Sequence, residues 1–219
     1  MLAAGDRHTC GLTLKDGRIV CWGLDDVTCK PPVGSSFETI TAGGMGTCVL
    51  DKGGRASCWG RSTIVLGVSE EPLSSITIAP GWACGITIAG QRAVCWGSPA
   101  IRVGEQQLQQ VDVHQKSDPT PVLEIASAPR ADYMCVVHKS GKLVCRGDAD
   151  MVQKTPQGKL YDQVRSGEAF ACARRRTGQI DCWDGAGEIS SPPLGDMVFA
   201  QWDLKYAHGC GVTSEGEVR

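Results

Sequence analysis

The sequence predicts an all-β protein built from repeats, and the placement of its cysteines is the first reason. Ten of the twelve cysteines form five close pairs, separated by 11, 10, 11, 10 and 10 residues. The first cysteines of these pairs, continued to Cys210, recur at intervals of 38, 36, 51, 37 and 38 residues. A fixed period of this size is typical of repeat architectures, so each repeat is expected to be one small structural unit.

Each close pair of cysteines flanks a turn. In the first repeat, Leu12, Leu14 and Ile19 alternate with polar residues on both sides of an Asp-Gly step, a pattern that indicates a β-hairpin. The two cysteines then stand at about the same level on its arms, where cross-strand Cβ atoms lie about 4.5–5.5 Å apart and a bridge is feasible. The predicted hairpin disulfides are Cys10–Cys21, Cys48–Cys58, Cys84–Cys95, Cys135–Cys145 and Cys172–Cys182.

A further strand precedes the hairpin of each repeat. The run Phe-Glu-Thr-Ile-Thr at residues 37–41 is rich in strand-forming residues. Each repeat is therefore expected to be a small antiparallel sheet of three or four strands within a single domain covering residues 1–219. The expected repeats span about residues 1–36, 37–73, 74–122, 123–160, 161–198 and 199–219, the last of them incomplete.

The repeat sequence resembles a known family. Residues 4–12 read AGDRHTCGL and residues 16–23 read DGRIVCWG. This pattern resembles the regulator of chromosome condensation repeat, in particular the cysteine-rich extracellular branch found in crinkly-type receptor kinase ectodomains. The resemblance runs through the whole chain, weakening in the fourth and fifth repeats. It implies a β-propeller of about six small antiparallel blades, although seven is the usual number in the family.

Charge and hydropathy narrow the range of partners. The formal net charge is −2, and a nucleic-acid surface needs a basic patch or stripe. The one dense basic run, residues 174–176, is interpreted as a solvated hairpin tip, so no nucleic-acid partner is expected. No apolar run approaches the ~20 residues that span a bilayer, and direct membrane insertion is therefore not expected.

Cysteine spacing favours disulfides over metal or redox chemistry. Structural zinc sites use cysteines two to four residues apart, whereas the paired cysteines here are at least 10 apart. A redox-active Cys-x-x-Cys is absent as well. Neither a metal nor a cofactor is expected. Disulfides at this density persist in an oxidising compartment, which predicts an extracellular location, secreted or at the cell surface.

Two cysteines, Cys29 and Cys210, remain outside the hairpin pairs. One alternative joins them to each other, because the first and last blades of a closed ring are neighbours. Another pairs Cys210 with a cysteine just past Arg219, where the repeat would place one. Cys29 is then free or bridges to a partner chain.

The tryptophans divide into two groups. Trp22, Trp59, Trp96 and Trp183 all follow the second cysteine of a repeat. Successive residues of a strand point to opposite faces, so these rings are expected to pack between neighbouring blades. Trp82 and Trp202 lie outside this register. Trp82 comes just before the first cysteine of its repeat and is the candidate for an exposed contact at the rim.

The interval from Cys84 to Cys135 is longer than the others, and the excess lies in a loop expected over residues 98–123. Long insertions in repeat proteins often map to the binding face, and the candidate binding residues there are Gln106, Gln109, His114 and Lys116. The alternative is a tolerated insertion without function, because lengthening a surface loop costs little free energy.

No catalytic set emerges from the sequence. A Gly-x-Ser-x-Gly elbow and a His-Glu-x-x-His motif are both absent. His8 and His208 hold equivalent repeat positions, which predicts a structural role for both. The tripeptide Arg146-Gly147-Asp148 matches an adhesion motif but coincides with the repeat positions of Trp and Gly. The chain is therefore not expected to be an enzyme.

Three hypotheses for function follow. The first is an extracellular, non-catalytic binding module for another protein or an extracellular glycan. The second is a structural propeller domain of a larger extracellular polymer, receptor or other assembly. A secreted enzyme inhibitor or a propeller lyase is a more distant alternative, and a lyase would need an acid–base set converging on one site.

Overall fold

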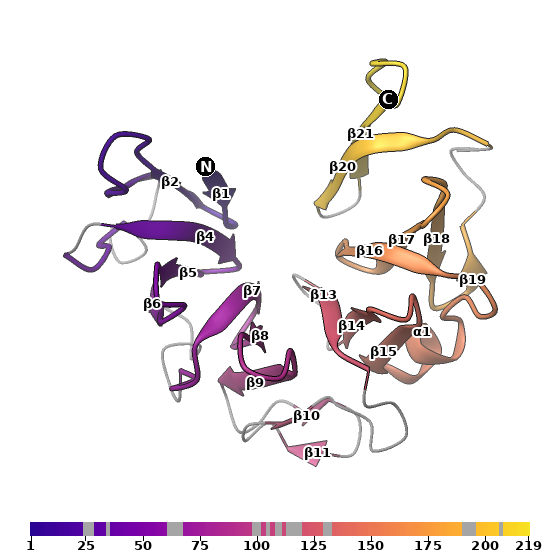
Figure 1. Ribbon diagram of the computed structural model, residues 1–219, viewed down its shortest axis with the longest axis horizontal. Coiled ribbons are helices and arrows are strands. Elements are labelled where there is room, and N and C mark those ends of the chain that lie inside the picture. Colours follow the sequence, from indigo (N-terminus) through magenta and orange to yellow (C-terminus); the bar gives the residue numbers. More distant parts are fainter. Residues whose placement is uncertain are drawn as a thin grey trace. The chain divides into compact units, whose positions relative to one another are not determined.

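The computed structural model describes residues 1–23, 29–33, 36–60, 68–97, 102–103, 106–107, 111–112, 120–128, 133–189, 196–205 and 208–219. The chain divides into two compact units, Met1–Pro119 and Thr120–Arg219. Both are built from small antiparallel sheets (Figure 1). The predicted all-β architecture is thereby confirmed. Five sheets have the predicted three or four strands, whereas the sheet of the last repeat has two strands in the described residues.

Unit 1 contains three larger sheets. Sheet 1 is formed by β1, Leu2–Ala4; β2, His8–Leu12; and β3, Ile19–Gly23. Sheet 2 is formed by β4, Phe37–Gly43; β5, Gly46–Asp51; and β6, Ala56–Gly60. Sheet 3 is formed by β7, Leu73–Ala79; β8, Trp82–Thr87; β9, Ala93–Gly97; and β12, Val111–Asp112. A separate short ladder joins β10, Arg102–Val103, to β11, Gln106–Gln107.

Unit 2 repeats this arrangement. Sheet 4 is formed by β13, Val122–Ser127; β14, Tyr133–His138; and β15, Leu143–Gly147. Sheet 5 is formed by β16, Tyr161–Ser166; β17, Phe170–Arg175; β18, Ile180–Asp184; and β19, Gly187–Glu188. Sheet 6 is formed by β20, Phe199–Lys205, and β21, His208–Thr213. A short helix, α1, Ala149–Gln153, lies between sheets 4 and 5 in the sequence.

The five predicted hairpin disulfides are all present. In every case the two cysteines are direct cross-strand partners, as in Cys135 opposite Cys145. Their Cα atoms lie 4.0–4.1 Å apart. The disulfide therefore fixes the register of the second and third strands of its sheet.

A glycine ends the Cys-Trp-Gly segment because the neighbouring strand approaches too closely for a side chain. Gly60 has a φ of 124°, and a Cβ there would lie 2.2 Å from the Met45 carbonyl oxygen. Gly97 repeats this geometry, with a φ of 132° and 2.3 Å to the Gly81 carbonyl oxygen. Non-glycine residues rarely adopt such a φ, and the local crowding excludes them independently.

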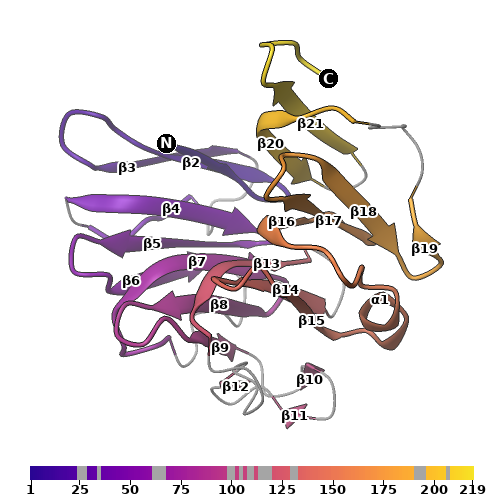
Figure 2. The same cartoon turned by 45° about the vertical axis from the view of Figure 1, so that its right-hand side comes forward.

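Successive sheets of one unit pack face to face. In unit 1, β1 and β2 contact β4, while β4 and β5 contact β7 (Figure 2). In unit 2, β13 and β14 contact β16, and β16 contacts β20. The hydrophobic core is accordingly a series of clusters, one at each junction between two sheets.

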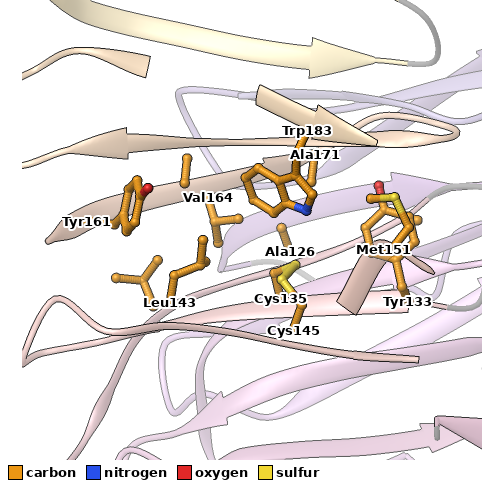
Figure 3. Packing of buried hydrophobic residues seen from close by; sticks show 13 residues of the cluster. Ala126, Tyr133, Cys135, Leu143, Cys145, Met151, Tyr161, Val164, Ala171 and Trp183 are labelled. Carbon is orange, nitrogen blue, oxygen red and sulfur yellow. A yellow bond between two sulfur atoms is a disulfide. The ribbon is translucent and has the colours of Figure 1, made fainter. Parts of the chain in front are cut away.

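The same pair of groups recurs at three junctions, namely the disulfide of one sheet and the tryptophan of the next. Trp59 shares a cluster with Cys10, and Trp96 shares one with Cys48. Trp183 lies beside the Cys135–Cys145 disulfide (Figure 3). This arrangement follows from strand alternation, which turns the cysteine and the next residue to opposite faces.

Trp22 departs from the expectation for its repeat position. Its side chain is 51% exposed, whereas that of Trp96 is 2% exposed. The physical reason is that Trp22 lies on sheet 1, the first of unit 1. The other face of that sheet, carrying Cys10 and Leu12, packs on sheet 2, so the face of Trp22 has no sheet before it in the unit.

Helix α1 was not expected from the repeat pattern. Asp148 caps its N-terminus, accepting a hydrogen bond from the Met151 backbone N–H at 3.0 Å, as aspartate often does at this position. Met151 is buried in the cluster between sheets 4 and 5. The aspartate of the Arg-Gly-Asp tripeptide therefore has a structural role as a helix cap.

A buried carboxylate braces sheet 5. The Asp181 side chain is 3% exposed and accepts hydrogen bonds from Tyr161 Oη at 2.9 Å, Lys159 Nζ at 3.0 Å and Arg175 Nε at 2.8 Å. Burial alone would raise the pKa of Asp181, but these three donors outweigh it and hold the pKa below its ordinary value.

The tryptophan position gives a matched test of the junction packing. We expect Trp96→Ala to lower the free energy of unfolding by about 3–5 kcal/mol, the usual cost of truncating a buried tryptophan. Trp22→Ala, in the same unit and at the same repeat position, should cost roughly 1 kcal/mol. Urea unfolding followed by circular dichroism measures both values, and equal losses would contradict the proposed packing.

The buried carboxylate gives a pH-dependent test. Asp181→Asn should lower the free energy of unfolding by on the order of 2 kcal/mol at pH 7, because the hydrogen bonds lose their charged acceptor. Since the folded pKa lies below the unfolded value of about 3.9, the wild-type advantage persists above that pH. It disappears as the pH falls through the folded pKa. Glu215→Gln, at an exposed position, is the control, and an advantage of the wild type that stayed constant down to pH 2 would contradict the assignment.

Candidate functional site

The segment expected to be a binding loop contains strands. Within residues 98–123, β12 pairs with β9 and adds a fourth strand to sheet 3, with Val111 opposite Cys95. The β10–β11 ladder places Arg102 opposite Gln107 and Val103 opposite Gln106. At least part of the insertion is therefore sheet, which differs from the plain loop that the sequence suggested.

The structure describes one of the four candidate binding residues of this segment. Gln106 lies in β11. Gln109, His114 and Lys116 lie outside the described residues. Their proposed role in binding remains a prediction.

Trp82 is fully buried, so the expectation that it forms an exposed contact is wrong. It stands two residues before Cys84 and thus faces the same side of the strand as that cysteine. His8 and Tyr133 hold the same position before Cys10 and Cys135, and both are also buried. The sequence interpretation missed this shared position because three different residue types occupy it.

The histidine of this position ties two sheets together in unit 1. His8 Nε2 lies 2.6 Å from Thr47 Oγ1, which joins sheet 1 to strand β5 of sheet 2. His208 has the same repeat position in sheet 6 but is exposed, so the expected equivalence does not extend to its environment. Tyr133 donates from its hydroxyl to the Phe170 carbonyl, and burial raises the pKa of this phenol.

The three residues of the arginine run all have intrachain partners, and Arg176, in the hairpin turn, is exposed as the sequence predicted. Arg174 binds both carboxylate oxygens of Asp162, at 2.9 and 3.0 Å. Arg175 binds Asp181, and Arg176 donates to the Lys139 carbonyl at 2.6 Å. These side chains brace the sheets of unit 2.

One concave site in unit 2 is a groove between sheets 5 and 6. It has a volume of about 400 Å³ and a mostly apolar lining that includes Phe170, Ile180, Leu204 and the Cys172–Cys182 disulfide. Trp202 closes part of it, with Nε1 donating to Gln163 Oε1 at 2.6 Å and the Arg165 guanidinium 5.6 Å from the ring centroid.

The remaining cysteines carry free thiols in this structure. Cys29 is half-buried and Cys210 is exposed and contributes to the groove. They belong to different units, and their pairing with each other stays a prediction.

The described residues contain few features of catalytic or metal chemistry. Within these ranges, no three His, Cys, Asp or Glu side chains are grouped so that they could hold a metal ion. His138 is buried and donates from Nδ1 to the Thr120 carbonyl at 2.7 Å.

Across the described residues, no helix reaches the length and apolar character needed to cross a bilayer.

Comparison with known proteins identifies the repeat. Residues 2–27 match the regulator of chromosome condensation (RCC1) repeat. No curated protein matches the chain in sequence. The family match thus covers the first repeat, where the sequence resemblance is also clearest.

Solved structures with the same fold cover the whole chain. The crinkly ectodomain of the Arabidopsis thaliana receptor kinase ACR4 shares 20% identity with a TM-score of 0.74, over 97% of this chain and 74% of that one. For the entire ectodomain of the Physcomitrella patens receptor kinase CR4 the identity is 22%, the TM-score 0.77 and the coverage 100% of this chain but 59% of that one. Prp20p of Saccharomyces cerevisiae shares 14% identity with a TM-score of 0.71, and the match covers 94% of this chain and 66% of that one.

These similarities agree with the hairpin disulfides and the repeated Cys-Trp-Gly segments. Identities below 25% indicate a shared fold and leave function to be argued from sites. The first repeat of the chain therefore matches the regulator of chromosome condensation repeat, and the whole chain has a disulfide-bonded, all-β fold similar to that of the crinkly receptor ectodomains.

Proposed function

We propose that this chain is an extracellular, non-catalytic binding module that recognises another protein or an extracellular glycan. The observation that carries the proposal is the set of five hairpin disulfides, one in each of sheets 1 to 5. Cytosolic and nuclear thiols are kept reduced, so a scaffold stabilised in this way suits an oxidising compartment.

The similarity to two receptor ectodomains supports the extracellular location. Prp20p binds Gsp1p and histones, so a propeller of similar fold can serve protein recognition. For the present chain, the contact surface is proposed to include the segment 98–123 with Gln106, Gln109, His114 and Lys116. Insertions on a rigid repeat scaffold are a common location for specificity.

A structural role in a larger extracellular assembly is the second candidate, and an exposed apolar face favours it. Leu2, Val20 and Trp22 lie on one face of sheet 1 and are each at least half exposed. Exposed apolar patches often mark interaction surfaces. This face suits permanent packing against another domain.

An array of purified extracellular protein domains and glycans tests the proposal. We expect the oxidised chain to bind a defined member of the array. Combining Gln106→Ala, Gln109→Ala, His114→Ala and Lys116→Ala should weaken that binding by at least about tenfold, with an unchanged melting temperature. Gln153→Ala with Lys154→Ala, at exposed positions of similar chemistry, is the control.

Binding that is unchanged in the fourfold variant would remove the segment from the contact surface. Binding that depends instead on Trp22 would favour the structural assembly. An oxidised, folded chain that binds no member of the array would contradict the binding-module proposal.

A further inference from the structure

The hairpin turns of sheets 4 and 5 meet at one side of the junction between these sheets. The Gly141 carbonyl accepts a hydrogen bond of 2.9 Å from the Tyr161 N–H, and the Leu160 carbonyl accepts one of 3.0 Å from the Arg176 N–H. The Arg176 guanidinium also donates to the Lys139 carbonyl at 2.6 Å. These bonds hold together the turn after β14, the residue before β16 and the turn after β17.

Basic side chains lie around an exposed leucine at this place. Leu160 is 56% exposed. A Cβ at Gly141 would lie 3.1 Å from the Leu160 Cβ and 3.3 Å from the Arg176 Cζ, so both side chains lie beside this turn. The basic surface, as we name it, consists of this leucine and four basic residues that are exposed at least in part, namely Lys139, Lys142, Lys159, Leu160 and Arg176.

The basic surface carries more positive charge than its carboxylate neutralises. Lys159 Nζ lies 3.0 Å from Asp181 Oδ1, but Arg175 binds the same carboxylate, so two positive charges share one negative charge. Lys139 and Arg176 make no ion pair within the described residues. Because the whole chain has a formal net charge of −2, this excess of positive charge is local to one junction.

The equivalent place between sheets 2 and 3 has the same backbone geometry but different side chains. There the Gly54 carbonyl accepts from the first residue of β7 at 2.7 Å. Ile88 takes the position of Arg176, since its N–H donates to the carbonyl just before β7 at 2.8 Å. Glu71 stands where the fifth repeat has Lys159. The positive charge therefore belongs to the junction of sheets 4 and 5 and is not a requirement of the repeat.

We propose that the basic surface binds an acidic peptide segment of a partner protein, with an apolar residue between its carboxylates. The carboxylates pair with the lysines and with Arg176, whose guanidinium can bind a carboxylate through two parallel hydrogen bonds. The apolar side chain covers Leu160. Complementary charges across a contact speed association and select the partner.

The exposed leucine favours a peptide over a sulfated glycan. A glycan of that kind presents negative charge without an apolar group, and it would leave Leu160 in water. The basic surface shares no residue with the segment 98–123, and its test does not depend on the contact proposed there.

Fluorescence polarisation with labelled peptides tests the proposal on the intact, oxidised chain. The probe is fluorescein-Gly-Glu-Asp-Leu-Glu-Asp-amide. One comparison peptide has serine in place of leucine, and the other has glutamine and asparagine in place of the acidic residues. We expect the probe to bind at least about tenfold more tightly than the neutral peptide and about threefold more tightly than the serine peptide. Its affinity should fall as the NaCl concentration rises from about 50 to about 300 mM.

Two matched double variants connect this binding to the basic surface. Lys139→Gln with Lys142→Gln should weaken binding of the probe at least about fivefold, because two of its cationic contacts are lost. Lys52→Gln with Arg55→Gln changes the same two positions of the sheet 2 hairpin, which are also exposed, and should leave binding unchanged. Leu160→Ser should remove the preference for the leucine peptide over the serine peptide. Equal melting temperatures show that the variants are folded.

Three outcomes would overturn the proposal. Equal weakening by the two double variants would show that binding follows net charge alone. Binding of the neutral peptide as tightly as the probe would show that carboxylates are not recognised. Binding of a heparin oligosaccharide at the basic surface without binding of the probe would assign this surface to a sulfated glycan.

Discussion

The contact between the hairpin disulfide of one sheet and the tryptophan of the next is the interaction on which the rest of the structure depends. A sheet of three short strands is marginal by itself, and a bridge across a loop of 10 or 11 residues stabilises it by about 3 kcal/mol. The same bridge presents sulfur and strand backbone to the following sheet. Trp59, Trp96 and Trp183 cover these surfaces and join separate hairpins into a packed core within each unit.

This construction leaves faces without a matching sheet inside each unit, and one of them, on sheet 1, is where permanent packing against another domain is proposed. Sheet 1 exposes the face that carries Trp22, while sheet 6 exposes His208 and Cys210. The groove between sheets 5 and 6 is lined by the Cys172–Cys182 disulfide together with Trp202 and other apolar side chains. The inserted segment 98–123, which contains Gln106, is a second proposed contact surface. It lengthens the third repeat relative to the others.

The sequence was informative where the repeat is regular. Cysteine spacing predicted five correct disulfides, because cross-strand pairing leaves little choice within a hairpin of 10 or 11 residues. Burial was less predictable, since the environment of Trp22 depends on whether another sheet lies beside it. Trp82 was misassigned because His8 and Tyr133, at the same position, do not resemble it chemically. The Asp181 network and helix α1 depend on particular side chains of sheets 4 and 5 that the repeat pattern does not specify.

Disulfide mapping is the most direct test of the central claim. The folded chain is alkylated without reduction, digested and analysed by mass spectrometry. The account predicts alkylation at Cys29 and Cys210 only, with the other ten cysteines recovered as the five hairpin pairs. Twelve alkylated cysteines in a folded chain, or bridges that join different sheets in place of the hairpin pairs, would contradict it.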